Sequence, residues 1–124
     1  MSARSLNKVQ LIGNLTRDPE VTTTSNNSKV CRFTVATNRS WTTEGGEKKE
    51  ETEFSRIIAW QKLAELCENL LIKGSKVYIE GRLKTSKFTG QDGIERVSTE
   101  IVADDMILLG GGKQEAASEP TVTQ

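Results

Sequence analysis

The chain has 124 residues, of which 35% are apolar, and its 17 Lys and Arg are balanced by 17 Asp and Glu, so the formal net charge is zero. That length predicts one domain at residues 1–109 with a flexible polar tail at residues 110–124, and neither a membrane-spanning run nor a signal peptide is visible, so we expect a cytoplasmic protein. With no His and two distant Cys, a metal site is not expected, whereas zero net charge still allows a nucleic-acid partner if the cations gather on one groove.

The first predicted element is a strand over residues 6–16 with alternating apolar positions. Gly13 interrupts its apolar face, and a glycine within a strand often marks the bend by which a sheet turns a barrel corner. Residues 21–24 add a short extended piece. A second strand follows at residues 29–38, where alternation places three apolar side chains inward: Cys31, Phe33 and Val35.

Residues 39–51 have the composition of a polar loop, and Trp41 is its only large apolar side chain. A Trp in the core of a protein usually has apolar neighbours, which this segment lacks. We therefore favour contact with a ligand for Trp41, and the alternative is that it anchors the loop.

Residues 52–60 are rich in β-branched and aromatic side chains, which predicts a strand. Because side chains alternate, Phe54, Arg56 and Trp60 share one face with Ile58. Rings interleaved with positive charge suit unpaired nucleic acid, whose bases stack on aromatic side chains and whose phosphates attract cations. The alternative is that the two rings close the two ends of a small barrel.

Apolar residues at helical spacing predict a helix over residues 61–73, ended by Gly74, with this buried stripe: Leu63, Leu66, Cys67, Leu70 and Leu71. A strand follows at residues 75–83, in which Gly81 allows a second bend. Residues 84–88 and 96–102 form a protruding hairpin, and residues 106–109 complete the core. This order predicts an all-β protein with one helix, namely an OB-fold: a five-stranded Greek-key barrel with the helix between strands three and four.

Several motifs carry a family resemblance: LNKVQLIGNL at residues 6–15 followed by DPE, ATNRSW at 36–41, KKEETEF at 48–54, KLAE at 62–65 and KGSKVYIEGRL at 73–83. Through them the chain resembles bacterial-type single-stranded DNA-binding proteins over residues 4–109. The resemblance implies binding to single-stranded DNA without sequence specificity, protection of that DNA in replication, recombination and repair, and a location at the nucleoid or replication fork. It implies neither catalysis nor a cofactor.

The resemblance also implies roles for individual residues. Bases would stack on Trp41, Phe54, Trp60 and Phe88, where Phe54 and Phe88 occupy positions at which the family commonly has Trp. Phosphates would be bound by Arg4, Lys8, Lys49, Arg56, Lys62, Lys73, Lys84, Lys87 and Arg96. The family forms homotetramers, which implies an oligomer interface at Leu6, Lys8, Gln10, Ser55 and Tyr78, with Ser55 where the family often has a His in a subunit contact.

The end of the chain departs from the family. Family members usually end in a short acidic tip with Phe and Pro that recruits replication and repair enzymes, whereas this sequence ends in EPTVTQ. Recruitment through such a tip is therefore not expected here.

Two other classes of function compete with DNA binding. An enzyme is disfavoured because Glu50-Glu51 and Asp104-Asp105 are sequence neighbours whose side chains project apart in a strand, and the spacing of a phosphate-binding loop is absent around Gly74. An OB-fold used for protein contacts or for RNA is the nearer alternative.

Overall fold

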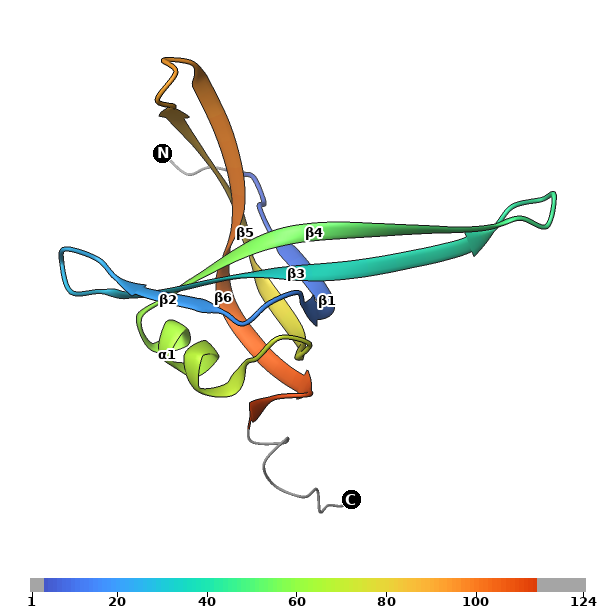
Figure 1. Cartoon of the computed structure of the whole chain (residues 1–124), viewed down its shortest axis with the longest axis horizontal. Coiled ribbons are helices and arrows are strands. Elements are labelled where there is room, and N and C mark those ends of the chain that lie inside the picture. The colour runs from blue at the N-terminus through green and yellow to red at the C-terminus, as the bar shows by residue number, and fades with distance from the viewer. Residues whose placement is uncertain (1–3, 114–124) are drawn as a thin grey trace.

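The structure is a computed structural model that describes residues 4–113. Six strands and one helix follow one another along the chain (Figure 1). They are β1 (Val9–Leu15), β2 (Glu20–Thr23), β3 (Lys29–Thr42), β4 (Lys48–Trp60), α1 (Gln61–Leu70), β5 (Lys76–Thr89) and β6 (Glu95–Gly110). No helix in this part of the chain has the length and apolar character needed to span a membrane.

The strands form one sheet that closes on itself. Its order is β1-β5-β6-β4-β3-β2, and an additional pairing of β1 with β3 joins the two sides into a barrel of five strands. The pairings are antiparallel except for a short parallel contact between β4 and β6. The predicted barrel, with its helix between the third and fourth barrel strands, is confirmed, and β2 lies at the edge of β3.

The core fills the barrel with alternate side chains of the strands, such as Val35, Ile57 and Ile79, and α1 adds Ala64 and Cys67. Cys31 and Cys67 are both fully buried in this core. A hydrogen bond between the two thiols lowers the pKa of Cys31 and raises that of Cys67, which burial raises further.

Gly13 and Gly81 lie where the predicted bends were expected. A Cβ atom on Gly13 would be 2.3 Å from the carbonyl oxygen of Ala36 on β3, and one on Gly81 would be 2.1 Å from the carbonyl oxygen of Val102 on β6. Gly13 lies just before the point where β1 stops pairing with β5 and begins to pair with β3. Gly81 lies beside the shift in register between β5 and β6. Both glycines therefore allow backbones to approach more closely than a side chain permits.

The prediction of a polar loop at residues 39–51 was wrong. Strands β3 and β4 continue as a paired arm in which Trp41 faces Lys49 across the ladder, and only residues 43–47 lie between the two strands. An arm that leaves the barrel has solvent on both faces, so it lacks the apolar alternation by which a strand is recognised in a sequence.

The predicted helix was too long at its end and misplaced one buried residue. Helix α1 ends at Leu70, and Leu71 is extended, with ψ of 144°, and fully buried, whereas Leu66 is exposed. The turn that follows is held by Ser75, whose hydroxyl accepts a hydrogen bond from the backbone of Ile72 at 2.9 Å and donates one to a carbonyl at 3.0 Å. The chain therefore leaves the helix at Leu71, and the extended backbone there places the Leu71 side chain in the core.

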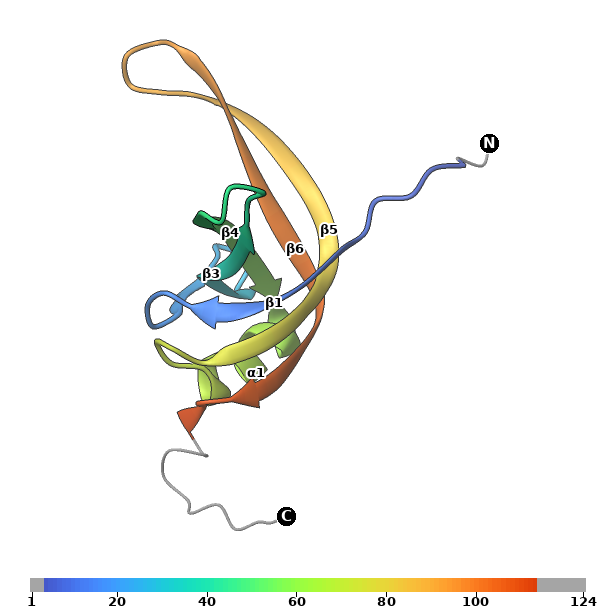
Figure 2. The ribbon, with the colours of Figure 1, turned by 90° about the vertical axis from the view of Figure 1, so that its right-hand side faces the viewer.

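Strands β5 and β6 form the second arm, which curves away from the barrel (Figure 2). The sequence predicted two separate pieces at residues 96–102 and 106–109, but β6 is continuous over Glu95–Gly110. The register shift between Glu80 and Gly81 places Asp104 as an extra residue in β6, because Glu80 pairs with Asp105 and Gly81 pairs with Ala103. The predicted tail is described as far as Lys113; within it Gly112 is buried, and the rest lies outside the described residues.

Candidate nucleic-acid interface

The β4 strand presents two aromatic rings at the surface. Phe54 is 62% exposed and Trp60 is 41% exposed, while Ile58 between them is buried with Val30 and Val102 in a small second cluster. Since both rings are open to solvent, the alternative in which they close the barrel ends does not hold.

This face continues from β4 onto the second arm. Arg56 donates a hydrogen bond from Nη2 to Oγ of Ser98 at 3.2 Å. Along β6, Ser98 alternates onto the same face as Arg96, whose cross-strand partner is Phe88, a ring that is 50% exposed. Phe54, Trp60 and Phe88 therefore share one surface, which we call the outer face.

Trp41 does not lie on the outer face. Phe54 pairs with Ala36, and Trp41 is an odd number of positions further along β3, so its side chain leaves the opposite side of the ladder. The ring is 38% exposed, and the guanidinium carbon of Arg39 lies 4.5 Å from its centroid. Three of the four predicted stacking residues thus come together, and the fourth is on the reverse side of the first arm.

The predicted phosphate-binding residues divide in the same way. Arg56, Lys84 and Arg96 alternate onto the outer face, whereas Lys49 accompanies Trp41 and Lys87 leaves the other side of the second arm from Phe88. The remaining members are exposed in the first turn of α1, in the turn before β5 and ahead of β1: Lys62, Lys73, Arg4 and Lys8.

Some of these cations already have carboxylate partners. Arg96 is paired with Asp92, and Nζ of Lys8 lies 2.6 Å from Glu80. The hydrogen bond between Lys8 and Glu80 raises the pKa of Lys8 and lowers that of Glu80, to which a hydrogen bond from Tyr78 also contributes. These two cations are therefore less available to phosphate than Arg56.

Most of the predicted oligomer interface lies together on β1 and β5. Gln10 donates to the Tyr78 hydroxyl at 3.0 Å, and that hydroxyl donates to Glu80 at 2.9 Å, beside Lys8. Leu6 is exposed ahead of β1. Ser55 is apart from this group, because it pairs with Val35, which is itself the partner of Leu15 at the far end of β1.

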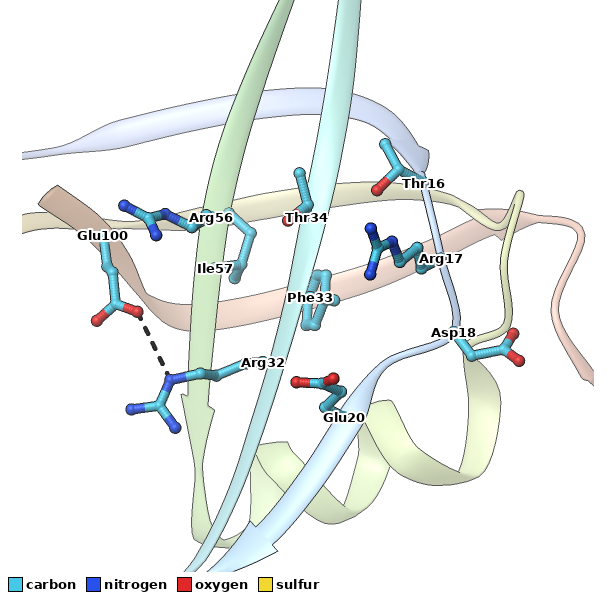
Figure 3. A pocket seen from close by; sticks show the side chains of 10 residues that line it. All are labelled: Thr16, Arg17, Asp18, Glu20, Arg32, Phe33, Thr34, Arg56, Ile57 and Glu100. Atoms are coloured by element: carbon cyan, nitrogen blue, oxygen red, sulfur yellow. Dashed lines mark ion pairs between the residues drawn. The ribbon is translucent and has the colours of Figure 1, made fainter. Parts of the chain in front are cut away.

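Two features of the surface were missed in the sequence. Asn7 makes a pair of hydrogen bonds with the backbone of Leu83, each 2.9 Å long, so the segment before β1 is attached to β5. A pocket also opens between residues 16–20 and the outer face, lined by Arg17, Arg32 and Glu100 among others (Figure 3). The outward position of Arg32 followed from strand alternation, but its contact with Glu100 of β6, at 3.6 Å, had no signal in the sequence.

Within residues 4–113, no group of three or more His, Cys, Asp or Glu side chains is arranged to hold a metal ion. The surface instead offers flat rings and guanidinium groups, of which Phe54, Arg56 and Trp60 lie on β4 and Phe88 and Arg96 lie on the second arm. A closed five-stranded barrel with its helix before the fourth strand, and with its exposed rings on this face, defines an OB-fold protein.

Comparison with known proteins agrees with this class. A model described as the Single-strand binding protein family matches residues 6–109. Proteins named single-stranded DNA-binding protein from Neisseria meningitidis serogroups A and B are each 47% identical over 116 residues, covering 94% of this chain and 67% of theirs. A solved structure described as Plasmodium falciparum SSB complex with ssDNA has a TM-score of 0.80 and 34% identity, covering 89% of this chain and 100% of that one. The chain belongs to the single-strand binding protein family.

Proposed function

We propose that this protein binds single-stranded DNA without sequence specificity and protects it during replication, recombination and repair. The observation that carries the proposal is the outer face, where Phe54, Trp60 and Phe88 are exposed beside Arg56. The names of the Neisseria meningitidis relatives support it, as does the similarity to the Plasmodium falciparum complex with ssDNA. Bases stack on the rings, and phosphates contact the Lys and Arg side chains.

Binding of this kind acts by occupancy. In a duplex the bases are stacked on each other and their faces are unavailable, so rings of this kind select unpaired strands. A strand held on the protein is kept from reannealing and from nucleases, and this needs neither turnover nor a cofactor. The place of action is wherever single strands arise, which in a bacterial-type cell is the replication fork.

Trp41 extends the surface along which we expect the DNA strand to run. Because its ring is on the reverse side of the β3–β4 arm, a strand that stacks on both Phe54 and Trp41 passes around the edge of that arm. Lys49 and Arg39 lie near Trp41 and supply positive charge there. The proposed path therefore wraps the arm instead of following one flat groove.

A titration of intrinsic fluorescence with oligo-dT at several salt concentrations tests the proposal. We expect tight binding with quenching, weakened by salt, and a loss of about 1–3 kcal/mol for Trp60→Ala and for Phe54→Ala. Leu66→Ala, which truncates an exposed side chain of α1, is the matched control and leaves affinity unchanged. Equal affinity for duplex DNA would contradict the model, and stronger binding to oligo-U would favour an RNA-binding role.

We further propose that the protein is a homotetramer that uses the β1–β5 surface. Ile12, Tyr78 and Ile107 are consecutive cross-strand neighbours on three strands, and Ile12 and Ile107 are 52% and 49% exposed. In the described part of the chain, Val9–Ile12 of β1 pair with β5 only, so one edge of β1 is open to another strand. An apolar stripe beside an open edge suits association with a second copy.

A further inference from the structure

The outer face carries a carboxylate among its cations. Glu100 is on β6, where alternation places it on the same face as Ser98 and Arg96. Its cross-strand partner on β5 is Lys84, and its Oε2 is 3.6 Å from Nε of Arg32 on β3, an ion pair drawn in Figure 3. A carboxylate in this place repels the phosphates that the surrounding cations attract.

The proposed path of the DNA strand passes Glu100. The sheet order places β6 between β4, which carries Phe54 and Trp60, and β5, which carries Phe88. A strand that stacks on rings of both β4 and β5 therefore crosses β6. The crossing lies near Glu100, because β4 and β6 pair at the residues that directly follow Arg56 and Glu100.

The other two carboxylates that line the pocket beside Arg32 are away from this crossing. Asp18 accepts a hydrogen bond from the backbone N–H of Lys73 at 2.8 Å, which ties it to the turn before β5. Glu20 is on β2, which is separated from β6 by both β3 and β4. Of these three carboxylates, Glu100 is therefore the one that a strand running between the rings meets.

The ion pair between Arg32 and Glu100 is loose enough to be exchanged. At 3.6 Å it is longer than a charge-assisted hydrogen bond, whereas Lys8 and Glu80 are 2.6 Å apart. The Arg32 and Glu100 side chains are 51% and 26% exposed, so water screens their attraction. The closest contact uses Nε, and a guanidinium has further N–H donors on its two terminal nitrogens. A phosphate can therefore take the place of the carboxylate at little cost.

We propose that Glu100 limits the affinity for single-stranded DNA, because it holds Arg32 in the free protein and gives it up to a phosphate in the complex. The proposal rests on the proposed function, since it requires DNA on the outer face. Binding then exchanges one ion pair for another and gains less than contact with an unpaired cation would. The limit keeps the bound strand exchangeable, and it is the same for every base, so binding stays independent of sequence.

The test measures affinity for oligo-dT at several salt concentrations. Glu100→Gln should bind about fivefold more tightly at about 0.1 M salt and steepen the slope of log K against log salt by about 0.7, the effect of one more phosphate contact on a single strand. Glu65→Gln makes the same change in net charge on α1, outside the pocket and both arms. Screening by salt should leave the affinity of this control nearly unchanged.

A double-mutant cycle tests the part assigned to Arg32. Arg32→Gln should weaken binding more in the Glu100→Gln background than in the wild type, because only in the wild type does the arginine leave a partner when it meets a phosphate. Equal losses in the two backgrounds would show that the two side chains act separately and would overturn the proposal.

The remaining outcomes separate the proposal from the proposed function. If Glu100→Gln binds no more tightly than the wild type, or if Glu65→Gln gains as much, Glu100 does not limit affinity, and the proposed function stands. Absence of binding to any single strand would overturn both. If Glu100→Gln perturbs folding, the Nε–H signal of Arg32 in the NMR spectrum of the wild type decides: it should shift when oligo-dT is added, and an unshifted signal would overturn the proposal.

Discussion

At the scale of single residues, the contact between Arg39 and Trp41 holds the indole ring in an orientation in which a base can stack on it. The guanidinium carbon is 4.5 Å from the ring centroid, within the range of a cation–π interaction. The ring is 38% exposed, and this contact is one of the interactions that hold it in place. It also leaves one face of the indole to Arg39 and the other to a base.

We therefore expect Arg39→Ala to weaken oligo-dT binding by about 0.5–1 kcal/mol, with Arg39→Lys restoring part of the lost affinity. The measurement is quenching of Trp41 fluorescence in a Trp60→Phe background, where Trp41 is the sole Trp. Lys29→Ala removes a cation that is paired with Glu68 and serves as the control. Tighter binding by Arg39→Ala would mean that the guanidinium blocks the ring.

The hydrogen-bonded group of Lys8, Tyr78 and Glu80 should make the stability of the protein depend on pH at both extremes. The pKa of Glu80 in the folded protein is below its ordinary 4.5, so its stabilising effect is complete above the unfolded value and is lost as pH falls through the lowered one. The pKa of Lys8 is raised above 10.5, so its effect is complete below that value and is lost as pH rises through the raised one.

The carboxyl carbon shift of Glu80, followed by NMR, should accordingly titrate below pH 4.5. Lys8→Met removes the hydrogen bond that is the largest cause, so it should move the midpoint upward. An unchanged midpoint in that variant would show that Lys8 does not hold the carboxylate in solution.

At the scale of elements, the barrel depends on two close backbone approaches. Gly13 brings β1 against Ala36 of β3, and Gly81 brings β5 against Val102 of β6, with no space for a Cβ at either position. The core residues beside them, such as Val35 and Val77, are fully buried, so the strands have little freedom to move apart.

Gly13→Ala and Gly81→Ala should each lower the free energy of unfolding by about 1–3 kcal/mol, because the added methyl group forces backbones apart. Urea denaturation measures this change. Gly45→Ala is the matched control, since a Cβ there would have no neighbour closer than 4.0 Å and the position is not in the left-handed region. If all three variants were equally stable, the barrel corners would be more adaptable than this geometry implies.

At the scale of the whole molecule, two surfaces serve two proposed partners. The outer face carries the rings, and the β1–β5 surface carries the apolar stripe of Ile12, Tyr78 and Ile107 with the open edge of β1. Neither surface is needed to close the barrel. The zero net charge is compatible with this division, because binding to DNA depends on the cations that reach phosphates together and not on the sum of all charges.

Tyr78→Arg and Ile12→Glu should each shift the protein from tetramer toward smaller species, because each places a charge in the apolar stripe. Sedimentation velocity measures the mass. Ile94→Glu changes a residue that is equally exposed but lies near the tip of the second arm, and it should leave the mass unchanged. A wild-type protein that sediments as a monomer would refute the tetramer.

By itself the sequence determined the element order, the barrel and much of the core, because alternation along a strand and the spacing of a helix are local patterns that burial imposes on the chain. It also identified the exposed rings Phe54 and Trp60 and placed Arg56 with them. Only the tertiary structure decided that Trp41 lies on the reverse side of an arm, that the helix gives up its last turn to bury Leu71, and that Arg32 meets Glu100. These depend on register and on contacts between strands far apart in the chain, for which no local pattern exists.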